Sequence, residues 1–323
     1  MKFRTEICID SFGFNITHEE KIMLIGSCFS ENISRRLSSA MFDICTNPSG
    51  IIYNPFSITE SLYLLMNRTV FSKDDLSEHN GLYHSFRHHS SFSSPDSREI
   101  LSKINSCITE GHEYLKQCRH LFLTIGTSWI YRLANNGSIA ANCHKFPADY
   151  FRHELLSAAS IADNLSECLL SLKNFNPDLN IIFTVSPVRH WKEGAVNNQR
   201  SKSVLIEAVH AVIEKNARCF YFPAYEIMMD DLRDYRFYAD DMLHPSDAAV
   251  DYIYEKFCIA FFNESTRKLN HEIDTINKML NHKPFFPDSK DHDLFKKKIS
   301  EKIRKLPNAG IISKYVKILN EEI

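Results

Sequence analysis

The sequence predicts an α/β fold with a parallel sheet covered by helices on both faces. Short runs of about five apolar residues alternate with longer segments of helical pattern, and glycine or proline follows several of the runs. Strands that helices bury on both faces are typically such continuous apolar runs. Sheets of this kind bind ligands at the carboxyl ends of their strands, so we expect the functional residues there.

The first half of the sheet is expected from two strands and two helices. Residues 21–25 (KIMLI) form an apolar run that stops at a glycine, and residues 31–41 read as a helix. A short strand is expected at 43–46, because the turn sequence Asn-Pro-Ser-Gly follows it at 47–50. Residues 58–67 read as the next helix.

The second half is expected from three strands and three helices. Residues 121–125 (LFLTI) end at a glycine, and residues 180–185 (NIIFTV) end at Ser-Pro. Between them, 155–173 is a long amphipathic helix that an Asn-Pro-Asp turn terminates. The remaining expected elements are a helix at 201–216, a strand at 218–223 (RCFYFP) and a helix at 247–262.

Two regions depart from this alternation. Residues 68–95 are polar and rich in Ser and His, which is typical of a long, solvated loop or flap over one sheet edge. An Asn-Asn-Gly turn separates 129–133 from 138–142 and predicts a hairpin. After residue 262 the chain becomes charged, and we expect helices at 265–280, 290–306 and 311–322.

We therefore expect a catalytic-type domain at 1–263 and a C-terminal helical extension at 264–323. The extension is expected to pack on the domain or to mediate association as a homodimer.

Composition excludes several classes of protein. The chain has 323 residues, and its 38 Lys and Arg nearly balance 40 Asp and Glu, so no nucleic-acid partner is expected. Nine cysteines without CxxC spacing favour a reducing compartment and no disulfide framework. No apolar run approaches the ~18 residues of a membrane helix, so we expect no membrane span and a cytoplasmic location.

Ser27 is the first candidate for chemistry, because it follows the first strand and precedes a helix in the sequence GSCFS. A nucleophile there lies beside helix N-terminal N–H groups, which stabilise negative charge. The alternative is that the serine merely caps the helix. Cys28 is a rival nucleophile, because a thiol at a helix N-terminus has a lowered pKa. We favour Ser27.

Asp241 and His244 are the second candidates, in the loop DMLHPS before the last sheet-covering helix. A D-x-x-H spacing places a carboxylate beside an imidazole, which then accepts a proton from a hydroxyl. A surface loop with a stray histidine is the alternative. A strand-end serine together with D-x-x-H is more specific than either alone, since the pair supplies nucleophile, base and orienter.

Five sequence blocks resemble the GSCFA-domain family: GSCFS (26–30), TIGTSWIY (124–131), TVSPVRH (184–190), NNQRSK (197–202) and DMLHPS (241–246). Ser30 departs from the signature, which ends in Ala. The family is similar to SGNH/GDSL hydrolases, and this resemblance implies a flavodoxin-like three-layer α/β/α sandwich. It also implies that Ser27 is the nucleophile, His244 the general base and Asp241 its orienter.

This sequence matches the oxyanion-hole residues of SGNH enzymes less well than it matches their catalytic residues. SGNH enzymes use a glycine of the second block and an asparagine of the third, and Gly50 matches the former. Ser128 stands at the asparagine position, and Asn54 is a further candidate donor. Losing one donor costs about 2.7–4 kcal/mol of transition-state stabilisation. His89 and His190 are candidate pocket residues.

The resemblance implies an esterase or acyl-transferase that acts on a small-molecule or carbohydrate ester and needs no metal or organic cofactor. The histidines at 79, 84, 88 and 89 suggest a metal site, but no Cys or carboxylate is spaced to complete one, and a solvated loop is favoured. A binding or scaffold protein on the same fold is the second hypothesis. Nucleotide binding is disfavoured, since GxGxxG and P-loop sequences are absent.

Overall fold

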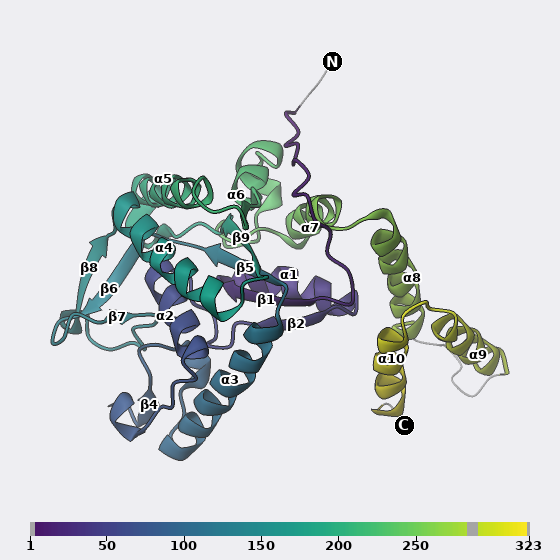
Figure 1. Ribbon diagram of the computed structural model, residues 1–323, viewed down its shortest axis with the longest axis horizontal. Helices are drawn as coiled ribbons and strands as arrows, with labels where there is room; N and C mark the ends of the chain where they lie inside the picture. The colour runs from purple at the N-terminus through teal and green to yellow at the C-terminus, as the bar shows by residue number, and fades with distance from the viewer. Residues whose placement is uncertain (1–3, 283–289, 322–323) are drawn as a thin grey trace.

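A computed structural model describes residues 4–282 and 290–321 and confirms the α/β prediction (Figure 1). Five parallel strands form the central sheet in the order β10-β9-β5-β1-β2. This is the flavodoxin-like order, in which the direction of strand addition reverses between β1 and β5. The strands are β1 (Lys21–Gly26), β2 (Asp43–Thr46), β5 (His120–Ile125), β9 (Asn180–Val185) and β10 (Cys219–Tyr221).

Helices cover both faces of the sheet and make the three layers (Figure 1). On one face, α1 (Cys28–Ser39) and α7 (Asp247–Phe261) bury Ile33 and Phe257 against strand side chains such as Phe122. On the other face, the second apolar core joins the sheet to α2 (Pro55–Met66), α4 (Ala158–Phe175) and α5 (Gly194–Ile213). The three central strands β1, β5 and β9 are therefore buried on both faces, which explains their continuous apolar sequences.

Local capping makes two helices begin earlier than expected. The Ser27 hydroxyl accepts a hydrogen bond from the Phe29 N–H and starts α1 at Cys28. The Asn54 side chain accepts from the Ser57 N–H, and Pro55 fills the first position of α2. Both arrangements satisfy amide groups that a helix N-terminus otherwise leaves unpaired.

The predicted hairpin forms, and it belongs to a separate antiparallel sheet. Strands β6 (Trp129–Leu133) and β7 (Ile139–Ala140) pair with each other, and the unexpected strand β8 (Phe151–Leu155) pairs with β6. A further unexpected element is the 21-residue helix α3 (Ser97–Gln117). The Asp96 carboxylate caps α3, and the helix buries Ile100, Ile104 and Ile108 along one face.

The prediction of a solvated loop at 68–95 is wrong. The segment contains η1 (Lys73–Asp75), η2 (Ser90–Phe92) and a hairpin of β3 (Ser77–His79) with β4 (Leu82–His84). His84 and His88 are buried, because their ring nitrogens bond to Ser93 and Ser85 and their rings pack on aromatic side chains. Within the described ranges, no three His, Cys, Asp or Glu side chains are grouped so that they hold a metal ion.

The C-terminal extension consists of three helices, as expected: α8 (Glu264–Leu280), α9 (Lys290–Arg304) and α10 (Ala309–Glu321). Helix α9 ends two residues before the expected bound and α10 begins two residues before it, and residue 322 lies outside the described part. Lys314 Nζ donates to the carbonyls of Met41 and Phe42, just before β2. The extension therefore packs beside the amino ends of the strands. None of the described helices combines the length and the apolar character needed to cross a bilayer.

The remaining short elements surround the carboxyl edge of the sheet or its flanking loops. They are η3 (Ala148–Tyr150), η4 (Trp191–Glu193), α6 (Ala224–Glu226), the π-helical turn Ile227–Asp231 and η6 (Tyr235–Phe237).

Candidate active site at the carboxyl edge of the sheet

Ser27 lies at the point where the strand order reverses. Gly26 before it has φ +148°, and a Cβ there would lie 2.2 Å from the Thr124 carbonyl oxygen. Glycine is therefore required for β1 and β5 to approach this closely. The Ser27 side chain is 3% exposed, and its hydroxyl donates to Ser186 Oγ at 3.0 Å, at the end of β9. Ser27 is thus both a helix cap and a strand-end hydroxyl.

Asp241 and His244 form the expected pair. Asp241 Oδ2 lies 2.6 Å from His244 Nδ1, while Oδ1 accepts the backbone N–H groups of Leu243 and His244. The backbone donors, followed by the imidazole, lower the pKa of Asp241 to about 2. A carboxylate that holds Nδ1–H leaves Nε2 as the proton acceptor. Both side chains are 46% exposed, so the imidazole faces solvent.

One short segment contacts both candidates. Ser186, at one end, accepts the Ser27 hydroxyl, and the Arg189 N–H donates to the Leu243 carbonyl at 3.0 Å. Three residues of extended chain span at most ~11 Å, so Ser186 and Arg189, the residues that contact Ser27 and the His244 loop, lie within that distance of each other. No hydrogen bond joins Ser27 to His244 in the part of the chain that the structure describes.

The rival Cys28 lies in an environment opposite to the one expected. Burial raises the pKa of the Cys28 thiol, and the nearby carboxylate of Glu31 raises it further. The expectation that the helix N-terminus lowers this pKa is therefore wrong, because desolvation of the thiolate outweighs the helix. The thiol is consequently a poor nucleophile near neutral pH.

The three candidate oxyanion donors are engaged in internal hydrogen bonds. The Gly50 N–H donates to the Asn47 carbonyl at 2.7 Å and closes the 47–50 turn. Asn54 caps α2, and its amide also donates to Ser57 Oγ. Ser128 is fully buried, and its hydroxyl donates to Ser201. None of these groups forms a hydrogen bond with Ser27 among the described residues.

The two candidate histidines pack against different parts of the edge. His89 packs on the 47–50 turn, where a Cβ on Gly50 would lie 2.4 Å from His89 Cβ. The His190 ring lies 4.9 Å from that of Tyr53, and its buried Nε2 has no hydrogen-bond partner among the described residues. Burial, followed by the nearby charges of Lys202 and His244, lowers the pKa of His190 to about 3. His190 is therefore neutral near pH 7.

Lys202 is a member of this edge that the sequence did not single out. Its side chain is 1% exposed, and Nζ donates to the carbonyls of Gly126 and Ser186, both at 2.7 Å. Burial lowers the pKa of Lys202 to about 7. The lysine thus ties the ends of β5 and β9 to α5 and bonds to the backbone of Ser186, whose side chain accepts the hydrogen bond from the Ser27 hydroxyl. A lysine on a helix ordinarily faces water, so residue type does not mark this one, although it ends the family-like block NNQRSK (197–202).

Comparison with known sequences identifies the chain. It matches the GSCFA family over residues 21–257, which include every residue of the edge described above. The chain belongs to the GSCFA family. Residues 273–319 match the C-terminal domain of GSCFA domain proteins, the part formed by the C-terminal helices. No curated protein matches the chain.

Several solved structures resemble this GSCFA chain at low identity. A family 3 carbohydrate esterase from Clostridium thermocellum is 16% identical with a TM-score of 0.33, and the match covers 78% of this chain and 98% of that one. The acetyl xylan esterase Est2A from Butyrivibrio proteoclasticus is 11% identical with a TM-score of 0.38, covering 81% and 64%. A family 3 carbohydrate esterase from Talaromyces cellulolyticus is 10% identical with a TM-score of 0.34, covering 79% and 99%.

Proposed function

We propose that this protein is a serine hydrolase of the SGNH type, an esterase or acyl-transferase that acts on a small-molecule or glycan acyl ester. One observation carries the proposal. A buried strand-end serine and a carboxylate-paired histidine are both anchored to the segment 186–189. This brings a nucleophile and a base from sequence positions far apart to one edge of the sheet.

The chemistry assigns one role to each residue. Ser27 rotates from Ser186 toward His244, and its Oγ attacks the acyl carbon while His244 Nε2 accepts the proton. Asp241 stabilises the imidazolium, which then protonates the departing alkoxide. Water or an alcohol attacks the acyl-serine in the second half-reaction, with His244 again acting as base. The N-terminal end of α1 stabilises the oxyanion.

A binding protein on the same fold is the second candidate. The observation that favours it is the engagement of Gly50, Asn54 and Ser128 in internal hydrogen bonds. Without a side-chain oxyanion donor, catalysis loses about 2.7–4 kcal/mol of stabilisation. This candidate predicts no turnover.

Hydrolysis of p-nitrophenyl acetate tests the choice. We expect Ser27→Ala and His244→Ala each to reduce kcat/KM by about 10³-fold or more, because members of a triad act as a unit. Cys28→Ala is the matched control, since it changes the neighbouring side chain, and it should retain activity. A Ser27→Ala protein as fast as the parent would refute the proposal.

A further inference from the structure

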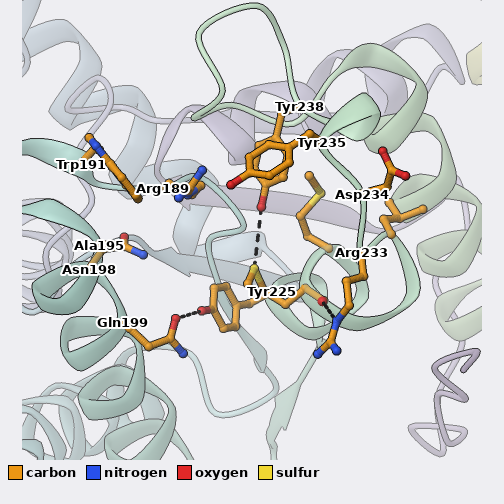
Figure 2. A pocket seen from close by; sticks show the side chains of 13 residues that line it. Arg189, Trp191, Ala195, Asn198, Gln199, Tyr225, Arg233, Asp234, Tyr235 and Tyr238 are labelled. Carbon is orange, nitrogen blue, oxygen red and sulfur yellow. Dashed lines mark hydrogen bonds between the residues drawn. The ribbon is translucent and has the colours of Figure 1, made fainter.

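A cavity of about 320 Å³ opens between the start of α5 and the segment 224–238 (Figure 2). Tyr225, Met228 and Leu232 make an apolar floor and are almost completely buried. Trp191 and Tyr235 lie at the rim and are 42% and 65% exposed. An apolar floor below exposed aromatic rings favours a ligand with a flat or apolar face.

Arg189 supplies the charge of this pocket. Its guanidinium carbon lies 4.0 Å from the Trp191 ring centroid and 5.6 Å from that of Tyr238, so it is in cation–π contact with both rings (Figure 2). One N–H donates to the Met242 carbonyl, and no carboxylate pairs with Arg189 among the described residues. Arg233, which also lines the pocket, differs because Asp230 pairs with it at 2.8 Å.

The Asp234 carboxylate also lines the pocket, where it accepts the Arg236 N–H and lies 3.8 Å from the Arg236 guanidinium, whereas two amides of the pocket leave donors unused. Asn198 Oδ1 accepts the His190 N–H, and Gln199 Oε1 accepts the Tyr225 hydroxyl. Each amide therefore still offers an NH₂ group, while its oxygen is occupied. Together with the unpaired guanidinium, these groups favour an anionic, acceptor-rich ligand.

The pocket adjoins the proposed catalytic edge. The Arg189 N–H bonds to Leu243, the residue before His244. The Tyr225 ring on the floor lies 5.7 Å from Lys202 Nζ. A ligand seated here is therefore held next to the loop that carries the general base.

We propose that this pocket is the recognition subsite and takes a flat ring that bears a carboxylate. The ring stacks among Trp191, Tyr235 and Tyr238, and the carboxylate binds Arg189. Binding of this ring in the pocket does not depend on the proposed function. The further claim, that the ring is part of the ester cleaved at Ser27, rests on the proposed function.

Ligand-observed NMR with 4-hydroxybenzoate tests the subsite without any turnover. We expect saturable binding to the full chain, weakened about tenfold or more in Arg189→Met, which corresponds to loss of one charge-assisted contact. Arg233→Met is the matched control and should bind as the parent does. Methyl 4-hydroxybenzoate, which lacks the charge, should bind the parent as weakly as 4-hydroxybenzoate binds Arg189→Met.

Three outcomes would overturn the subsite: no binding of 4-hydroxybenzoate to the parent, equal affinity for its methyl ester, or equal loss in both arginine variants. Arg189→Lys keeps the charge and serves if the methionine variant does not fold; it should retain preference for the acid over the ester. Binding without hydrolysis of 4-acetoxybenzoate would leave the subsite intact and count against the proposed function alone.

Discussion

Lys202 shows how one side chain organises the carboxyl edge. Its Nζ holds the carbonyls of Gly126 and Ser186, and Ser186 in turn accepts the Ser27 hydroxyl. A buried ammonium costs free energy unless a carboxylate pairs with it, and here its partners are neutral carbonyls. The lowered pKa of Lys202 follows from this burial.

Lys202 should therefore give the protein a distinctive pH dependence of stability. The unfolded chain holds this proton up to the ordinary lysine pKa of 10.5, whereas the folded protein releases it near pH 7. The unfolded state binds more protons between these values, so stability rises with pH there. We expect the parent to gain about 2 kcal/mol relative to Lys202→Met between pH 7 and pH 9.

Urea unfolding of both proteins at the two pH values measures this difference. Lys173→Met, at an exposed position on α4, is the control and should show no such change. An equal pH dependence in the parent and Lys202→Met would show that the buried amine keeps an ordinary pKa.

At the residue level, the sequence identified the groups that lie next to turns. Ser27 and the D-x-x-H pair stand directly beside strand ends and helix starts, so position along the chain locates them. Ser186 and Lys202 lie 159 and 175 positions after Ser27, and only the folded sheet brings their contacts together. Burial raises the pKa of Cys28, the opposite of what its helix position alone suggests.

At the scale of elements, apolar continuity predicted the central strands β1, β5 and β9, because both faces of each are buried, whereas the turn at 47–50 predicted the edge strand β2. The helix α3 was missed, since 97–117 is a mixture of polar and apolar residues whose one buried stripe is easily overlooked. Strand β8 was missed because its five residues are partly exposed and pair only with β6.

The hairpin β3–β4 and the loop after it should be sensitive to acid. Burial lowers the pKa of His88 to about 3, below the ordinary value of 6.5, and the nearby Arg87 and His144 lower it further. As the pH falls, the unfolded chain therefore binds a proton before the folded protein does, and stability is lost from about pH 6.5 downward.

We expect His88 to contribute about 2 kcal/mol of lost stability between pH 7 and pH 5. Over this range, the free energy of unfolding of His88→Gln, measured in urea, should fall by about 2 kcal/mol less than that of the parent. His89→Gln, one residue away and only half-buried, is the control. A parent and His88→Gln with the same acid sensitivity would mean that His88 is protonated equally in both states.

At the scale of the whole molecule, the two ends of the sheet serve different purposes. The C-terminal helices share an apolar cluster that includes the fully buried Tyr315, and they contact the chain at 39–42, beside the amino ends of the strands. Ser27, the His244 loop and the Arg189 pocket all lie at the carboxyl ends. The described residues of the extension therefore pack at the end of the sheet opposite the candidate site, and we propose a role for the extension in self-association.

Covalent labelling tests the central claim most directly. The full chain is treated with a fluorophosphonate probe, and the modified residue is located by peptide mapping. We predict a single adduct on Ser27, absent from Ser27→Ala and formed much more slowly in His244→Ala. An adduct on Cys28, no adduct, or labelling of Ser27 at the same rate without His244 would contradict the claim.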